Sequence, residues 1–242
     1  MTASSIKHDF VIHNEDAREP IYLEPRSGVH RNTLIWLHGF AQNGESQLKY
    51  FDENQHPVID EFTRVVLLTA PKIDCLYKGR QKPRNSWVSS LNPAETYGYT
   101  VEYVNNYIEE EVKFFQDDYS KILIGGFSQG GVMSAALALG NTDFRLGGVI
   151  VCSAFYHSNC PVLRNDVPLV IYHAEDDEVV PAFEACKTYR DFLVKNKVPF
   201  EFISVEMAGH EISFGGRDLI NQWYREVTTT GSSTGYKVAK LQ

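Results

Sequence analysis

A serine with glycines on both sides stands near the middle of this sequence. Residues 121–140 read KILIGGFSQGGVMSAALALG, so an apolar run stops at two glycines, and two more glycines precede a run of good helix formers. Residues 126–130 fit G-x-S-x-G between a predicted strand and a predicted helix, which is the context of a nucleophile elbow. We therefore predict that Ser128 is a nucleophile. The alternative is a phosphate-binding glycine turn, but the Lys-Ser/Thr pair of a P-loop does not follow.

A serine hydroxyl is a weak nucleophile unless a base takes its proton and an acid orients that base. After a nucleophile elbow, the acid and then the histidine follow in the chain. Of the eight histidines, His173 and His210 lie usefully downstream of Ser128. His173 is still inside the predicted strand PLVIYH, which favours a structural role. His210 lies in the glycine-flanked loop of VEMAGHEIS, where a side chain can reach over the sheet edge, and we predict that it is the base.

The acid is expected in the loop after the preceding strand. That loop reads HAEDDEVVP, and it contains Glu175, Asp176, Asp177 and Glu178. A run of carboxylates usually forms a solvated turn, so three of the four are expected to be ordinary surface residues. The pattern itself does not select the fourth.

Two backbone N–H groups are needed to stabilise an oxyanion. The residue after the nucleophile, Gln129, supplies one of them. The second is expected from an earlier strand–loop junction, and in WLHGFAQNG the candidate donor is Phe40. His38 precedes Ser128 in the chain, so we expect it to hold this loop rather than to act as the base.

The longest segment without clear periodicity covers residues 72–99. Such long loops in a compact domain are functional or disordered, and Trp87 and Leu91 indicate that part of this one packs against the body. We predict that the acyl part of a substrate lies against Trp87, Leu91 and Phe155. The alternative is that these three side chains belong to the ordinary core.

The elements that must position these residues follow from hydrophobic patterning. Short, β-branched apolar segments predict strands at 33–37, 64–68, 121–125, 147–154, 168–174 and 200–206, with two closely spaced strands at 10–12 and 21–23 forming an antiparallel edge. The middle segments are nearly continuous apolar runs, as in a parallel sheet covered on both faces. Helical spacing appears at 101–115, 132–139, 183–194 and 219–227. This alternation predicts an α/β fold with a mostly parallel central sheet and helices on both faces.

Length and patterning predict one domain over residues 1–228, followed by a polar, disordered tail at 229–242. The net charge of −8 argues against nucleic acid as a partner. The chain has no apolar run of about 20 residues, which argues against an integral membrane segment. The N-terminus lacks the apolar stretch of a secretory signal, so a cytoplasmic protein is expected. The cysteines form no C-x-x-C pair, which favours reduced thiols over disulfides or zinc.

These motifs resemble the acyl-protein thioesterase and carboxylesterase branch of the α/β-hydrolases, also called the phospholipase/carboxylesterase family. The resemblance covers roughly residues 33–224 and rests on LHGFAQNG, TAP at Thr69, SW at Ser86, GGFSQGG, HAEDDEVVP and GH at Gly209. The family's acid stands in D-x-x-V-P, and this matches Asp177. The resemblance also implies His210 as the base, with Phe40 and Gln129 as oxyanion donors.

The resemblance implies a serine hydrolase without a metal or other cofactor, which cleaves carboxylic esters or thioesters through an acyl-enzyme. Family members act on short-chain esters, lysophospholipids or fatty-acylated proteins, and many form homodimers. The chain departs from the family pattern at Phe40, Ala41 and Gln42, where Leu, Gly and Asp are common. It also departs at SWVSS, at HAED and at Glu178. These positions concern the rim or the acyl pocket, so they leave the substrate range open.

The sequence thus predicts a carboxylic ester hydrolase with thioester activity and a Ser128–Asp177–His210 triad. Within the enzymes, protein depalmitoylase and lysophospholipase are the alternatives. From another class, the alternative is a non-catalytic relative that binds a ligand or a partner. Such a relative has normally lost a triad member, whereas here all three stand in the expected order.

Overall fold

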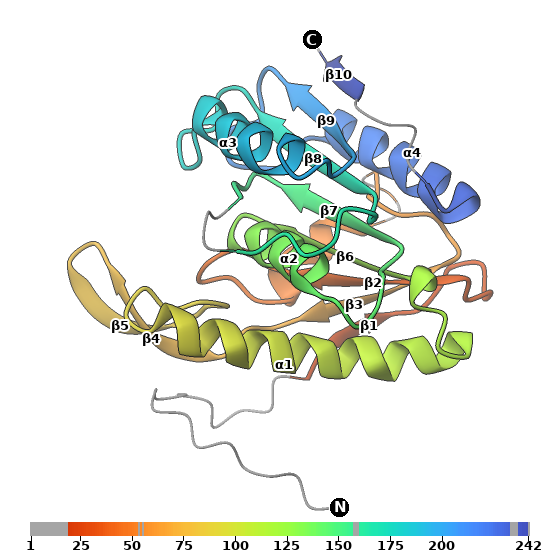
Figure 1. Ribbon diagram of the computed structural model, residues 1–242, viewed down its shortest axis with the longest axis horizontal. Coiled ribbons are helices and arrows are strands. Elements are labelled where there is room, and N and C mark those ends of the chain that lie inside the picture. Colours follow the sequence, from red (N-terminus) through yellow and green to blue (C-terminus); the bar gives the residue numbers. More distant parts are fainter. Residues whose placement is uncertain (1–18, 53, 55, 157–159, 233–236, 242) are drawn as a thin grey trace, which may run out of the picture.

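A computed structural model of the chain describes residues 19–52, 54, 56–156, 160–232 and 237–241. Its centre is an eight-stranded sheet with the order β1-β3-β2-β6-β7-β8-β9-β10 (Figure 1). Its strands are β1 (Ile21–Leu23), β2 (Asn32–Leu37), β3 (Thr63–Leu68), β6 (Ile122–Phe127), β7 (Gly148–Cys152), β8 (Leu169–Ala174), β9 (Phe200–Val205) and β10 (Lys237–Leu241). β1 runs antiparallel to β3, and the other neighbours are parallel. The predicted mostly parallel sheet is confirmed.

The central strands are apolar along their whole length because both faces of the sheet are covered. Every residue of β2, β6, β7 and β8 is buried. A strand with one solvated face would instead alternate between apolar and polar residues. The parallel arrangement brings the carboxyl ends of β6, β8 and β9 to one edge of the sheet, and the candidate site residues follow these ends.

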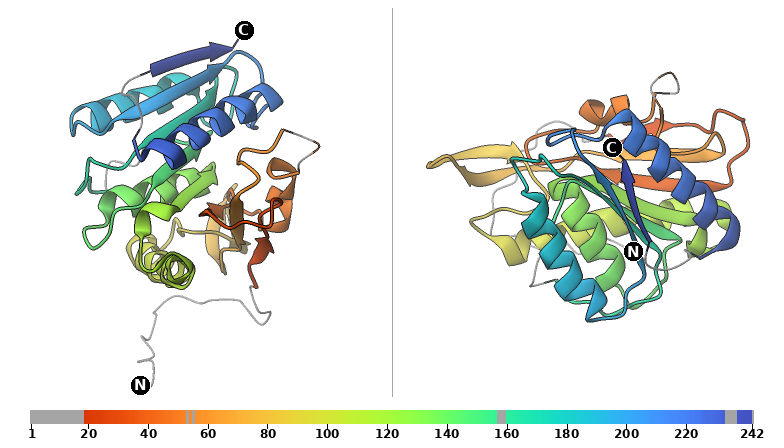
Figure 2. Two further views of the ribbon diagram at one scale, coloured as in Figure 1. Left: turned by 90° about the vertical axis from the view of Figure 1, so that its right-hand side faces the viewer. Right: turned by 90° about the horizontal axis from the view of Figure 1, so that it is seen from above.

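Helices cover the two faces separately (Figure 2). On one face, α1 (Pro93–Glu111), α2 (Gln129–Gly140) and α3 (Ala182–Tyr189) contribute to the larger apolar cluster. On the other face, the 3₁₀ helix η1 (Glu45–Tyr50) and α4 (Phe214–Thr230) contribute to the second. Three further turns are η3 (Val112–Phe115), η4 (Tyr119–Lys121) and the π-helical η5 (Arg190–Val194). All four predicted helical segments are confirmed within these elements.

The segment at 72–99 is more regular than the sequence predicts. It contains an antiparallel hairpin of β4 (Lys72–Tyr77) and β5 (Arg80–Asn85), which projects from the body in Figure 1. Lys78 and Gly79 both have positive φ, 50° and 72°, as a tight two-residue hairpin turn requires. β5 reads RQKPRN and has no apolar alternation, so its pattern carried no strand signal.

The C-terminal segment also differs from the expected disordered tail. α4 continues to Thr230, and Lys237–Leu241 forms β10 parallel to β9. Here the open edge of β9 supplies backbone partners, which the polar composition of the tail does not reveal. The predicted strand at 10–12 lies outside the described residues, and the 1–228 domain boundary stays a prediction.

Cys75, Cys152 and Cys160 are free thiols. Within the part of the chain that the structure describes, no helix combines the length and apolarity needed to cross a membrane.

Candidate active site

Ser128 stands at the junction of β6 and α2 in a backbone conformation that few non-glycine residues adopt. Its φ is 54° and its ψ is −121°. Its N–H donates to the carbonyl of Cys152 at 2.8 Å, and its own carbonyl accepts from Val132 N–H at 3.1 Å, which starts α2. The structure thus gives Ser128 the strained turn expected of a nucleophile elbow, at the positive end of a helix.

The glycines around this turn are required by close packing. A Cβ on Gly130 would lie 2.0 Å from the carbonyl oxygen of Leu37, and a Cβ on Gly126 would lie 2.4 Å from the carbonyl carbon of Gly130. Both distances are far below van der Waals contact with backbone atoms. No side chain fits where β6, α2 and the end of β2 converge.

His210 and Asp177 are joined at the same edge of the sheet. His210 Nδ1 lies 2.8 Å from Asp177 Oδ2, and the Asp177 side chain is fully buried. The other oxygen, Oδ1, accepts from the backbone N–H groups of Val179 and Val180 at 2.9 and 2.8 Å. A carboxylate held in this way requires the proton on Nδ1, so Nε2 of His210 is free to accept one.

The other three carboxylates of the run have different surroundings. Asp176 Oδ1 accepts from Ala208 and Gly209 N–H at 3.0 and 2.8 Å. Glu175 accepts from the Ser204 hydroxyl at 2.9 Å, and Glu178 is exposed. Of the four, Asp177 is the one that the structure buries against His210. The role of Asp176 in holding the turn before His210 was not predicted, because nothing in the run distinguishes it.

His210 also lies against the residue that precedes Ser128. The ring centroids of Phe127 and His210 are 4.8 Å apart. Since Ser128 follows Phe127 directly, and Asp177 follows β8 at the same edge, the structure gathers the three predicted triad residues there.

His173 is buried behind this pair. Its Nε2 donates to the carbonyl of Val180 at 2.7 Å and lies 3.6 Å from Asp177 Oδ2. Burial lowers the pKa of His173 below its ordinary value, so the ring stays neutral. It holds the loop that carries Asp177, in agreement with the structural role expected for it.

The loop that carries Phe40 is fixed on both sides. Gly39 N–H donates to Gln42 Oε1, and Ala41 N–H donates to the carbonyl of Asn85, both at 2.9 Å. Phe40 therefore stands between two anchored backbone groups. Gln129 is the first residue of α2, where backbone N–H groups have no intrahelical partner. These are the positions predicted for the two oxyanion donors.

His38 holds the start of this loop as a neutral side chain. Its Nδ1 donates to the carbonyl of Gly39 at 2.7 Å, and its Nε2 accepts from Ala70 N–H at 2.9 Å. Burial lowers the pKa of His38 to about 4. Both ring nitrogens are engaged, so His38 is structural, as expected from its place in the chain.

An apolar cavity of about 750 Å³ opens beside Ser128. Its lining consists of Val88, Ser89, Ser90, Pro93, Ala94, Tyr97, Ser128, Gln129, Val132, Met133, Ala154, Phe155, Cys160 and Val180. The first turn of α1 and the second turn of α2 form much of it. Sequence reasoning missed these positions, although apolar residues four and five places after Ser128 must lie near it on a helix.

Of the three predicted acyl-pocket residues, Phe155 lines this cavity, whereas Trp87 and Leu91 are not among its described lining. Trp87 is fully buried, and its Nε1 donates to the carbonyl of His38 at 2.7 Å. Leu91 is 41% exposed. Trp87 therefore supports the backbone just before the loop that carries Phe40.

The side chain of Gln129 connects the elbow to the cavity wall. Its Oε1 accepts from Trp87 N–H at 3.0 Å, and its Nε2 donates to the carbonyl of Val88 at 3.0 Å and to the Ser86 hydroxyl at 2.9 Å. Residues 86–88 are thereby held against the start of α2. The sequence predicted a role only for the backbone of Gln129.

Comparison with known proteins shows the family of this chain. The family described as Phospholipase/Carboxylesterase matches residues 22–216. The acyl-protein thioesterase 1 homolog 1 of Dictyostelium discoideum is 27% identical over 219 residues, which cover 84% of this chain and 93% of that protein. The probable carboxylesterase SOBER1-like of Arabidopsis thaliana is 26% identical over 246 residues, covering 93% and 90% of the two chains.

Solved structures show the same fold. Acyl-protein thioesterase 2 of Zea mays superimposes with a TM-score of 0.70 at 18% identity, over 88% of this chain and 100% of that one. SOBER1 of Arabidopsis thaliana superimposes with a TM-score of 0.67 at 22% identity, over 81% and 99%. The arrangement is the α/β-hydrolase fold, as the sequence resemblance implied.

Proposed function

Because the chain belongs to the phospholipase/carboxylesterase family, we propose that it is a serine hydrolase that cleaves carboxylic esters and acyl thioesters through an acyl-enzyme on Ser128. One observation carries the proposal. The imidazole of His210, held by Asp177 at 2.8 Å, lies at the sheet edge where the elbow presents Ser128. A nucleophile, a base and an orienting acid in this chain order are the parts that acyl transfer requires.

In the proposed mechanism, Ser128 Oγ attacks the acyl carbonyl while Nε2 of His210 takes the hydroxyl proton. Asp177 stabilises the imidazolium that forms. His210 then gives the proton to the leaving alcohol or thiol, which departs from the tetrahedral intermediate. A water molecule, deprotonated by the same imidazole, then attacks the acyl carbon of the acyl-enzyme. The bond to Ser128 Oγ breaks, His210 returns the proton to Oγ, and the carboxylic acid is released.

The backbone N–H groups of Phe40 and Gln129 hold the oxyanion in both steps. The N–H group of Phe40 is held by the anchored loop at 39–42. The N–H group of Gln129 belongs to the first turn of α2, where backbone N–H groups have no intrahelical partner. Donors that are already in place do not have to reorganise as the negative charge develops.

The acyl chain occupies the cavity beside Ser128, with Phe155 at its wall. A volume of about 750 Å³ with mainly apolar lining favours an apolar acyl group over a small charged one. The relatives named acyl-protein thioesterases are the reason to include thioesters, with acylated proteins and lysophospholipids as alternative substrates.

The test is a series of initial rates with p-nitrophenyl esters from acetyl to palmitoyl and with matched acyl thioesters. Wild-type protein is compared with Ser128→Ala. We expect the wild type to turn over these substrates and kcat of Ser128→Ala to be lower on the order of a millionfold. A fluorophosphonate probe should label the wild type and leave Ser128→Ala unlabelled. Absence of Ser128-dependent turnover and labelling would refute the hydrolase and favour the non-catalytic binding protein.

A further inference from the structure

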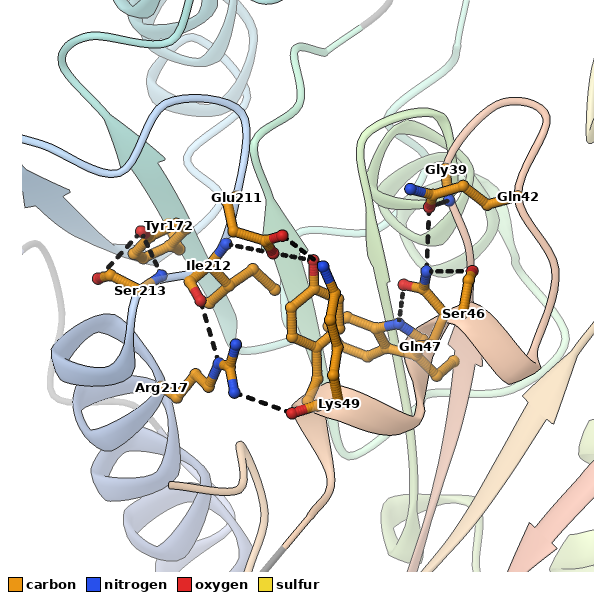
Figure 3. A network of polar contacts seen from close by, with 12 residues as sticks. Gly39, Gln42, Ser46, Gln47, Lys49, Tyr172, Glu211, Ile212, Ser213 and Arg217 are labelled. Atoms are coloured by element: carbon orange, nitrogen blue, oxygen red, sulfur yellow. Dashed lines mark hydrogen bonds and ion pairs between the residues drawn. The ribbon is translucent and has the colours of Figure 1, made fainter. Parts of the chain in front are cut away.

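The short helix η1 contacts the oxyanion loop (residues 39–42) through a buried glutamine (Figure 3). Gln47 is 1% exposed, and its Nε2 donates to Gln42 Oε1 at 3.0 Å. The same Gln42 oxygen accepts from Gly39 N–H at 2.9 Å. On its other side, Gln47 Oε1 accepts from Trp36 Nε1 at 3.1 Å. Through Gln47, η1 therefore fixes the backbone immediately before Phe40.

The last two residues of η1 contact the base loop (residues 208–213), which carries His210. The buried phenol of Tyr50 donates to Glu211 Oε1, and Lys49 Nζ donates to Glu211 Oε2. Glu211 Oε1 also accepts from Ile212 N–H at 3.0 Å. Glu211 follows His210 directly, so this carboxylate ties the base loop to η1.

A buried arginine closes the same junction from the side of α4. Arg217 is 5% exposed; its Nη1 donates to the carbonyl of Lys49 at 2.8 Å and its Nε to the carbonyl of Ile212 at 3.0 Å. The end of η1 and the base loop thus share one guanidinium, whose planar donors favour a fixed geometry.

The ring of Tyr50 reaches the nucleophile side of the site. Its centroid lies 5.9 Å from that of Phe127, which in turn lies 4.8 Å from the ring of His210. Tyr50 therefore packs against the residue before Ser128 and hydrogen-bonds the residue after His210. The single side chain of Tyr50 thus connects the segment that carries Ser128 to the segment that carries His210.

The ionisation of this pair suits a permanent contact. Burial and the neighbouring carboxylate raise the pKa of Tyr50 above its ordinary value, so the phenol keeps its proton. Burial alone would raise the pKa of Glu211, but hydrogen bonds from Lys49 and Tyr50 outweigh it and lower that pKa. Glu211 is therefore an ionised acceptor at neutral pH.

We propose that η1 is a brace that sets the distance between the oxyanion loop and the base loop, with Gln47, Tyr50 and Glu211 as positioning residues. The inference rests on the proposed function. Catalytic groups must be held within about 0.5 Å of their productive geometry. A misplacement of about 1 Å can cost on the order of a hundredfold in rate.

The test uses the full chain and p-nitrophenyl butyrate, with active sites titrated by a fluorophosphonate probe. Tyr50→Phe removes one hydroxyl and keeps the ring on Phe127. We expect kcat per titrated site to fall about tenfold with KM within about twofold. Glu211→Gln keeps one oxygen that can accept from Tyr50 but removes the charge that pairs with Lys49, and it should lower kcat per site in the same direction.

The contact of η1 with the oxyanion loop is tested with Gln47→Met, which removes the hydrogen bond to Gln42. This variant should also lower kcat per site at nearly constant KM. The matched control is Asp218→Asn. It removes the negative charge of an exposed carboxylate, which lies 2.8 Å from His56 Nδ1 and also joins α4 to the segment after η1. Its kcat should stay within twofold of wild type. A merely structural loss would lower the titrated fraction and leave the rate per site unchanged.

The proposal is overturned if Tyr50→Phe keeps kcat per site within twofold of wild type, or if Asp218→Asn falls as far. Should Glu211→Gln not fold, Tyr50→Phe still decides. Wild-type turnover that Ser128→Ala abolishes separates the two proposals. When that turnover is present and Tyr50→Phe is silent, the brace alone fails. When Ser128-dependent turnover is missing, the proposed function fails and the brace with it.

Discussion

His210 Nδ1 and Asp177 Oδ2 lie 2.8 Å apart although 33 residues separate them in the chain. The contact forms because β8 and β9 are parallel neighbours, so the loops that follow them leave the sheet at the same edge. Two backbone N–H groups and full burial hold the carboxylate still. The imidazole tautomer follows from this contact, which leaves Nε2 as the nitrogen that can accept a proton.

Replacing Asp177 by Asn should lower kcat on the order of ten-thousandfold, because the amide favours the wrong imidazole tautomer. The measurement is the steady-state hydrolysis of p-nitrophenyl butyrate. Glu178→Gln is the matched control, since it removes a neighbouring carboxylate that is exposed. Equal losses in the two variants would show that the negative charge of the run matters, and the contact with His210 does not.

Asp176 should contribute through its hydrogen bonds to Ala208 and Gly209 and not through its charge. Asp176→Asn keeps an accepting oxygen and should retain kcat within about threefold. Asp176→Ala frees the turn before His210, and we expect a loss of roughly tenfold. Comparing kcat in the two variants tests this, and an equal loss in both would contradict it.

Gly130→Ala should destabilise the fold strongly, because its Cβ would lie 2.0 Å from the carbonyl oxygen of Leu37. Overpacking against side chains costs about 1–3 kcal/mol, and rigid backbone should bring the loss to at least about 3 kcal/mol. Gly98→Ala is the control within α1, where a Cβ meets nothing within 4 Å. There alanine should stabilise by about 0.5–1 kcal/mol. Urea unfolding of both variants measures the difference, and similar values would refute the steric argument.

Acid should destabilise the protein between pH 6.5 and about 4, partly through His38. Its pKa falls from 6.5 to about 4 on folding because the ring is buried. In this window the unfolded chain binds a proton that the folded chain does not, so stability decreases as the pH falls. The full shift corresponds to about 3 kcal/mol. Protonated Nε2 would also face the Ala70 N–H that it accepts from in the native state.

The measurement is the free energy of unfolding in urea from pH 7.5 to 4.5. His173 should contribute in the same direction, since burial lowers its pKa as well. A His38→Asn variant has no titrating ring at this position. Its stability should therefore depend less on pH in this window, whatever its stability at pH 7.5. An unchanged slope would exclude His38 as a source of the acid sensitivity.

Narrowing the cavity should change the acyl-chain preference without affecting the chemistry. Val132 lines the cavity one turn after Ser128. Val132→Phe should reduce kcat/KM for palmitoyl esters about a hundredfold and keep the acetyl ester within about threefold. Val194→Phe, at an exposed position in η5, is the control. A uniform loss across chain lengths in Val132→Phe would show that the cavity does not hold the acyl group.

The elements that the sequence predicted well are those whose apolar pattern has a single explanation. β2, β6, β7 and β8 are continuous apolar runs, and such runs fit a sheet covered on both faces. β5 and β10 were missed for the opposite reason. β5 (RQKPRN) is mostly polar, and β10 (KVAKL) is a short segment within a polar tail. Each strand forms because a neighbouring strand edge supplies its hydrogen bonds.

Trp87 shows where composition misleads. A large aromatic residue in a long irregular segment fits an acyl pocket and a buried core equally well. The structure buries the ring against His38, whose backbone carbonyl accepts from Trp87 Nε1. The cavity wall comes instead from α1 and α2, and only the packing of these helices on the sheet brings them together.

The sequence by itself determined the parallel sheet, because continuous apolar runs fit a sheet covered on both faces. It also predicted the elbow and the chain order of the candidate serine, acid and histidine, because the glycines stand where no side chain fits. Among Glu175, Asp176, Asp177 and Glu178, the pattern alone left the candidate acid open. The family resemblance pointed to Asp177, and its burial against His210 gives the physical reason. The contact of Tyr50 with Glu211 was equally invisible, as 161 residues separate the two side chains. Such contacts depend on which loops the sheet brings to one edge, and local sequence patterns do not predict this.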